Sequence, residues 1–83
     1  MPRRVLWTEP ARADLRAIER ATALRILHAL ARYCDCGEGD VKRLQEIDPP
    51  ELRLRVGNYR LRFQLHEEAL VVLSVKHRRE AYR

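Results

Sequence analysis

The sequence predicts an α+β domain in which one strand is followed by two helices and then by three strands (β-α-α-β-β-β). Three observations support this prediction. Apolar residues recur at helical spacing over residues 10–34, apolar and polar residues alternate on both sides of residues 57–58, and residues 70–75 are almost entirely apolar. With 83 residues the chain has room for one sheet, two helices and a single core. We therefore expect residues 1–83 to form one domain.

The N-terminal half contains the first strand and both helices. Residues 5–7 form a short apolar run, and Thr8 and Pro10 after it favour the cap and the first turn of a helix. Apolar side chains three and four positions apart predict one amphipathic helix over residues 10–20 and a second over residues 22–34. The two segments either bend slightly into each other or form a helical hairpin, and we favour the hairpin.

A loop is predicted after the second helix, which Gly37 can end with left-handed backbone. Residues 40–47 show no clear period, and the prolines at 49–50 prevent a regular strand from continuing through that point. We expect a loop that carries at most a brief strand. Within it, Lys42 and Arg43 either flank the arginines of the following segment or are simply solvated.

The alternating region around residues 57–58 predicts a β-hairpin with a two-residue turn. Counting outward from this turn places Arg55 opposite Arg60 and Arg53 opposite Arg62, with all four guanidinium groups on one face of the sheet. Like charges opposite one another destabilise a sheet unless an anion or an acidic partner offsets them. The alternative is that the arginines splay into solvent and bury only their stems.

The apolar residues 70–75 predict a strand in the interior of the sheet, because both of its faces must be covered. The helices would cover one face. On the other face, if the preceding turn preserves the alternation, Val71, Leu73 and Val75 would form an apolar floor beside the arginines.

The last eight residues combine basic side chains with His77 and Tyr82. Phosphate binding, proton transfer and base stacking use these residue types. A frayed basic tail is the alternative explanation.

The charge of the chain points to an anionic partner. The formal net charge is +5, the pI is about 9.9, and fifteen of the seventeen basic residues are arginine, which suits bidentate phosphate binding. Residues 1–50 carry nine basic and eight acidic groups, whereas residues 51–83 carry eight and four. This C-terminal excess indicates nucleic acid or an acidic protein as the partner.

Several other classes of function are disfavoured. The sequence has no apolar window long enough to span a membrane and no apolar core of a signal peptide, so we expect a cytoplasmic protein. Cys34 and Cys36 are the only cysteines and lack a second ligand pair for zinc, so we expect reduced thiols. The acidic residues are scattered, and we expect neither a metal site nor a cofactor. His28 lies on a polar helical face, where an exposed histidine without a role is expected.

Five segments together resemble the RelE branch of the RelE/ParE toxin superfamily over essentially the full length. They are Trp-Thr at residues 7–8, Ala-Arg-Ala-Asp-Leu at 11–15, Gly-Asp-Val-Lys-Arg-Leu at 39–44, Leu-Arg-Val-Gly-Asn-Tyr-Arg-Leu-Arg-Phe at 54–63, and Val-Lys-His-Arg-Arg-Glu-Ala-Tyr-Arg at 75–83. The resemblance implies two N-terminal helices packed on one face of a small, mostly antiparallel four-stranded sheet. It also implies a ribosome-dependent mRNA endonuclease of a type II toxin–antitoxin pair, held inactive in a complex with a cognate antitoxin.

The resemblance also implies roles for individual residues. Arg60 matches the core catalytic arginine of the family and Tyr82 its C-terminal tyrosine, while His77 and Arg78 are further catalytic candidates. Cleavage without a metal can use the neighbouring 2′-hydroxyl as nucleophile, which needs a base, cations around the phosphorus and a proton for the leaving oxygen. His77 would transfer protons near neutral pH, and Tyr82 would stack on a base. Phosphate binding is expected from the remaining basic residues of the two segments, Arg53, Arg55, Arg62, Lys76 and Arg79.

Two alternatives to the nuclease remain. One is a ParE-like protein that inhibits DNA gyrase by protein contact, and the other is a non-catalytic relative that binds antitoxin or RNA. In each case we expect the antitoxin to contribute an acidic amphipathic segment that covers the exposed arginines.

Overall fold

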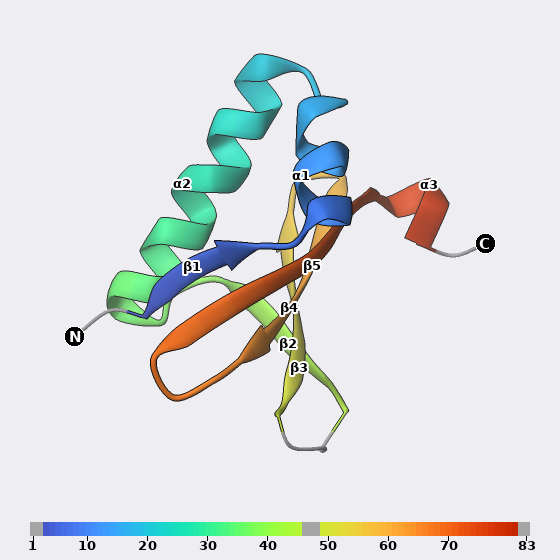
Figure 1. The fold of residues 1–83 in the computed structure, drawn as a ribbon. Coiled ribbons are helices and arrows are strands. Elements are labelled where there is room, and N and C mark those ends of the chain that lie inside the picture. Colours follow the sequence, from blue (N-terminus) through green and yellow to red (C-terminus); the bar gives the residue numbers. More distant parts are fainter. Residues whose placement is uncertain (1–2, 46–48, 82–83) are drawn as a thin grey trace.

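The computed structural model describes residues 3–45 and 49–81 of the chain (Figure 1). The elements are β1 (Arg4–Trp7), α1 (Glu9–Arg16), α2 (Arg20–Cys36), β2 (Asp40–Gln45), β3 (Glu51–Val56), β4 (Tyr59–Leu65), β5 (Ala69–His77) and α3 (Arg78–Ala81). This is the predicted α+β class with the predicted order of β1, the two helices and the last three strands. It contains one additional strand, β2, and one short C-terminal helix, α3.

The sheet has five strands in the order β1-β5-β4-β3-β2, so the prediction of four was wrong. β1 and β5 are parallel, and every other neighbouring pair is antiparallel. The additional strand β2 lies at the edge, where Val41 pairs with Leu54 of β3. Its pairing shifts between Arg43 and Gln45, and this bulge removes the alternation that would have identified a strand. Residues 46–48 of the predicted loop lie outside the described residues.

Both predicted helices form, with different boundaries. Thr8 caps α1, because its side-chain oxygen accepts a hydrogen bond from the Ala11 N–H at 3.4 Å. α1 ends at Arg16 and α2 begins at Arg20, and α2 ends at Cys36, before the cap residue Gly37, whose φ of 74° is left-handed. Figure 1 shows the two helices running in opposite directions, as a hairpin. Among the described residues, no helix is long and apolar enough to cross a membrane.

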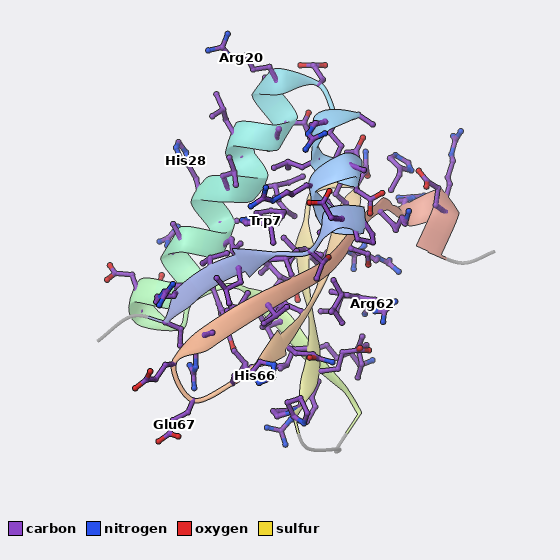
Figure 2. All side chains as sticks on the ribbon, viewed as in Figure 1. Trp7, Arg20, His28, Arg62, His66 and Glu67 are labelled. Atoms are coloured by element: carbon purple, nitrogen blue, oxygen red, sulfur yellow. The ribbon has the colours of Figure 1, made fainter. Side chains whose placement is uncertain are left out.

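The core lies between the two long helices and one face of the sheet. Trp7 of β1 packs against it and points into the space between α2 and the sheet (Figure 2). The rings of Tyr33 on α2 and Phe63 on β4 are 5.4 Å apart. The helices bury Ala11, Ile26 and Leu30 in this core. The strands contribute the buried apolar residues that face the helices: Leu52, Leu54, Leu61, Phe63, Leu70, Val72 and Val75.

Helix α1 covers the part of β5 that β1 leaves unpaired. β1 pairs with β5 only as far as Trp7 and Val72, and Thr8 then donates its hydroxyl to the Val72 carbonyl at 2.8 Å. Beyond this point, Oδ2 of Asp14 accepts a hydrogen bond from the Val75 N–H at 3.0 Å. The N-terminal helix is therefore fixed to the C-terminal half of β5.

A bulge in β5 changes which of its residues face the core. Arg62 of β4 pairs with Ser74, but the next residue, Phe63, pairs with Val72, so Leu73 is an extra residue in β5. The extra residue reverses the alternation, and Val75 is 3% exposed in the core. The prediction that Val75 lies beside the arginines was therefore wrong.

Candidate nucleic-acid interface

The predicted pairing of the hairpin arginines is confirmed. Arg55 lies opposite Arg60 and Arg53 opposite Arg62 across β3 and β4, and strand alternation places all four on the side of the sheet away from the core. Figure 2 shows Arg62 projecting from the side turned away from α2. Cross-strand pairing extends this arrangement to a basic residue of β2 on one side and of β5 on the other. We call this surface the basic face, and it consists of Lys42, Arg53, Arg55, Arg60, Arg62 and Lys76.

Arg60 differs from the other members of the basic face because it is buried, with 6% of its surface exposed. It lies between Arg55 of β3 and Lys76 of β5 in the pairing. Burial restricts the side chain, so its guanidinium group has a fixed position before any ligand binds. The planar guanidinium group is suited to bidentate binding of carboxylate or phosphate oxygens.

Acidic side chains fix two of the cations at the margin of the basic face. Glu51 holds Arg62 at 3.1 Å within β3 and β4, and Asp14 of α1 holds Lys76 at 3.0 Å. Among the described residues, Arg53 and Arg55 have no ion pair, although Asp40 lies opposite Arg55 in the pairing. The face therefore keeps a positive excess available to a ligand.

The bulge in β5 also decides which of its basic residues joins the basic face. Because it reverses the alternation, Lys76 lies opposite Arg60, whereas His77 lies opposite Tyr59 on the helix side of the sheet. The His77 and Tyr59 rings meet edge to face, with their centroids 5.2 Å apart. The structure thus brings Lys76 to the arginines and places His77 on the other side.

The C-terminal segment is tied to the hairpin turn. Arg78 donates its backbone N–H to the Asn58 carbonyl at 2.7 Å, and Arg79 donates its backbone N–H to Nδ1 of His77 at 3.2 Å. The side chains of Arg78 and Arg79 are exposed on α3, directly after the end of β5. Tyr82, the predicted stacking residue, lies outside the described residues.

Apolar side chains border the basic face on the β1 side. Val71 of β5 is half-buried and lies opposite Gln64 of β4 and beside Leu6 of β1. Leu6 is 45% exposed. Of the predicted apolar floor, Val71 lies beside the basic face, whereas Val75 is in the core and Leu73 is the extra residue of the bulge.

The contact between Asp14 and β5 was not predicted from the sequence, and it depends on the parallel pairing of β1 with β5. The structure also separates the two alternatives left open for Lys42 and Arg43. Of the two basic residues in the missed strand β2, Lys42 lies opposite Arg53 on the basic face, whereas Arg43 lies opposite Leu52 on the helix side. The position of Lys42 on the basic face could have been predicted from its place next to apolar Val41, but only if residues 40–45 had first been recognised as a strand.

In the described parts of the chain, the His, Cys, Asp and Glu side chains form no group of three or more that could hold a metal ion. Cys34 and Cys36 are both free thiols. Partial burial raises the pKa of the Cys34 thiol, and the Arg3 guanidinium group opposes this shift.

Comparison with known proteins gives one family. The family model described as "ParE toxin of type II toxin-antitoxin system, parDE" matches residues 5–82, which is nearly the whole chain. No curated protein sequence matches the chain.

Solved structures with the same fold cover almost the entire chain. The archaeal RelE–RelB complex from Pyrococcus horikoshii OT3 has a TM-score of 0.81 at 21% identity, over 94% of this chain and 97% of the matched chain. The toxin–antitoxin complex RelBE2 from Mycobacterium tuberculosis has a TM-score of 0.77 at 24% identity, over 93% of this chain and 99% of the matched chain. A double mutant of the E. coli toxin RelE in the free state has a TM-score of 0.76 at 18% identity, over 99% of this chain and 90% of the matched chain. At these identities the likeness establishes the fold.

Proposed function

Because the chain belongs to the ParE toxin family of type II toxin–antitoxin systems, within the RelE/ParE superfamily that its sequence resembles, we propose that it is a toxin that cuts mRNA on the ribosome. The basic face carries this proposal: a buried arginine, Arg60, lies among five further cationic side chains on one side of the sheet. Like charges opposite one another destabilise a sheet unless an anion offsets them, and a phosphodiester chain is such an anion.

The reaction that suits this face is attack by the 2′-hydroxyl of the RNA on its own phosphodiester. A bond forms between the 2′-oxygen and phosphorus, and the bond from phosphorus to the 5′-oxygen of the next nucleotide breaks. The 2′-hydroxyl loses its proton and the departing 5′-oxygen gains one, so the products are a 2′,3′-cyclic phosphate and a free 5′-hydroxyl. Negative charge builds on the phosphoryl oxygens during the attack, and prepositioned cations stabilise it.

The basic face offers a division of roles for this reaction. Arg60 is fixed by burial and would bind the phosphoryl oxygens of the scissile group through two N–H donors. Arg55 and Lys76 lie on either side of it in the pairing and would complete the charge around the phosphorus. Arg53 and Arg62 lie two residues further along the strands, where they would hold a neighbouring phosphate.

The C-terminal segment would complete the site. Arg78 and Arg79 are exposed on α3, which directly follows Lys76 and His77 of β5, and we propose that their guanidinium groups contact the RNA as it leaves the basic face. Arg78 would stabilise charge on the leaving oxygen, and Arg79 would bind backbone phosphate. Tyr82 would stack on an unpaired base, a role that needs no change in its protonation. Presentation of the mRNA by the ribosome would supply the remaining alignment.

A cognate antitoxin is proposed as the partner that silences the toxin in the cytoplasm. A hollow of about 450 Å³ lies between α2 and the β2–β3 edge, and its lining combines apolar Ala29 and Val56 with basic Arg32 and Arg55 and acidic Glu38 and Asp40. Glu38 already pairs with Arg32 at 3.0 Å, so an acidic amphipathic segment would bind the apolar side chains and Arg55. Because Arg55 also belongs to the basic face, a segment bound there would compete with RNA for the same cation.

A ParE-like inhibitor of DNA gyrase is the second candidate function. The observation that favours it is the description of the matching family, which names ParE. Such a protein would need its arginines for protein contact and would leave mRNA intact. A protein that binds antitoxin or RNA without catalysis is the third possibility.

The decisive experiment is primer extension on a reporter mRNA in a translating extract. It compares the wild-type chain with Arg60→Ala, and with Arg43→Ala, which also removes one positive charge but lies on the helix side of β2. We expect discrete cuts within the translated frame from the wild type and from Arg43→Ala, and a loss of about 10²- to 10³-fold for Arg60→Ala, the usual effect of losing one transition-state donor. Addition of the antitoxin should suppress the cuts.

Other outcomes select among the alternatives. Arrested growth with intact mRNA would contradict the nuclease and favour gyrase inhibition. Cuts of equal strength from Arg60→Ala and the wild type would remove Arg60 from the centre of the site. No growth effect at all would favour a binding protein.

A further inference from the structure

His77 lies where β5 ends and α3 begins, and three contacts converge on this junction. Its Nδ1 accepts a hydrogen bond from the Arg79 backbone N–H at 3.2 Å. The neighbouring Arg78 donates its backbone N–H to the Asn58 carbonyl at 2.7 Å, and the imidazole packs edge to face on Tyr59. The imidazole therefore connects Tyr59 of β4 with the start of α3, while the Arg78 backbone connects the same junction with the hairpin turn.

The Nδ1 contact has the geometry of a helix cap. The first N–H groups of a helix have no partner inside the helix, and a side-chain acceptor on the residue before the helix satisfies one of them. His77 directly precedes α3, and the N–H that it accepts belongs to the second residue of α3. Nδ1 can accept this hydrogen bond only where it carries no proton of its own.

The position of His77 separates it from the basic face. It pairs with Tyr59, whereas Lys76 pairs with Arg60. The next residue on the same side of β5 is Val75, which is buried in the core. An imidazole on this side of the sheet, with Nδ1 engaged by a backbone N–H, is poorly placed to take a proton from a 2′-hydroxyl bound among the arginines.

We propose that His77 is a positioning residue that caps α3 and thereby holds Arg78 and Arg79 against the end of the basic face, and that it transfers no proton in the reaction. The proposal depends on the nuclease function only for its effect on cleavage. The cap itself is a property of the fold. The caps found most often in proteins include Asn, whose Oδ1 is attached to Cγ just as Nδ1 is in histidine.

The test compares four substitutions of His77 in the purified full chain. His77→Asn keeps an acceptor at the position of Nδ1 but has no group that titrates near neutral pH. His77→Gln is the matched control, because it has the same amide one methylene further from the backbone. His77→Phe keeps the ring against Tyr59 without an acceptor, and His77→Ala removes both. Cleavage in the translating extract and hydrogen exchange of the Arg79 amide are measured for each.

We expect His77→Asn to match the wild type within about twofold in both measurements, while Gln, Phe and Ala accelerate exchange of the Arg79 amide and slow cleavage by about fivefold, the change that loss of one cap produces. A loss of cleavage by about 10²- to 10⁴-fold in His77→Asn, equal to that in His77→Ala, would instead identify an acid or base and overturn the proposal. Unchanged exchange of the Arg79 amide in His77→Ala would overturn it as well. If the wild type makes no cuts, the nuclease function fails, and amide exchange alone decides whether His77 caps α3.

Discussion

The two faces of the sheet use the same strands for opposite purposes. On the helix side, alternate residues of β3, β4 and β5 are apolar and buried, with Phe63 at 0% exposure. On the basic face, five of the intervening residues are cationic (Arg53, Arg55, Arg60, Arg62 and Lys76), and Arg60 is the one polar residue found buried among the described residues. Neighbouring residues of one strand thus lie in a dry core and on a charged surface.

The helix side of the sheet therefore mainly determines the stability of the fold, and the basic face mainly determines ligand binding. Apolar burial stabilises the fold in proportion to area, whereas exposed charges contribute little to stability and much to binding. A substitution on one face should therefore change one property and leave the other nearly intact. Arg60 is the exception, because it is buried like a core residue and charged like a binding residue.

The largest expected effect on stability is from Phe63→Ala on the helix side. Phe63 is fully buried and packs against the Tyr33 ring at 5.4 Å, so truncation leaves a cavity in the middle of the core. We expect a loss of about 3–5 kcal/mol in the free energy of unfolding, measured by urea denaturation.

The matched substitution on the basic face is Arg62→Ala, one residue before Phe63. Its side chain is 49% exposed, and its ion pair with Glu51 is at the surface. We expect a change of at most about 1 kcal/mol in the free energy of unfolding. Equal losses from Phe63→Ala and Arg62→Ala would contradict the separation of the two faces.

An intermediate effect is expected at Asp14, which connects the two sides. Its carboxylate accepts the Val75 N–H and also holds Lys76, each at 3.0 Å. Asp14→Ala removes both contacts and leaves the Val75 N–H without its acceptor, so we expect a loss of about 1–3 kcal/mol in the free energy of unfolding.

Lys76→Met is the control for this pair, because it removes the ion pair and keeps the backbone contact. The Lys76 side chain is 44% exposed, so the ion pair is screened by solvent, and its loss should cost less than about 1 kcal/mol in the same denaturation experiment. If Lys76→Met destabilised the chain as much as Asp14→Ala, the anchoring of α1 would depend on the ion pair rather than on the Val75 N–H.

The sequence was most informative where structure is local. The turn at Gly57, whose φ is 58°, fixes the register of β3 and β4, and alternation then places the four arginines on one face. The helix start at Thr8 and the helix end at Gly37 were likewise readable, because a cap depends on a few adjacent residues.

Prediction failed where distant pairing or an extra residue decides the outcome. The edge strand β2 is defined by its partner β3 and interrupted by a bulge, so its own sequence shows no period. In β5 a single extra residue, Leu73, moves Val75 into the core, brings Lys76 to Arg60 and turns His77 toward Tyr59. No local pattern in an apolar strand reveals such an insertion, although the insertion determines which residues belong to the basic face.

The smallest expected effect is a difference in reactivity between the two thiols near the end of α2. One lies on the side of the helix that packs against the core, and the other lies on the side that faces solvent. Cys36 is exposed, whereas Cys34 is half-buried against the core, and burial raises the pKa of its thiol. Because the thiolate is the reactive form, alkylation followed by intact-mass spectrometry should label Cys36 first, and the Cys34 rate should still be rising at pH values above its ordinary pKa. The raised pKa in the folded chain also means that the unfolded chain loses this proton first. Alkaline pH should therefore slightly favour unfolding. Equal alkylation rates for the two cysteines across pH would show that the end of α2 opens as fast as the reagent reacts, so that the core side there is no better protected than the solvent side.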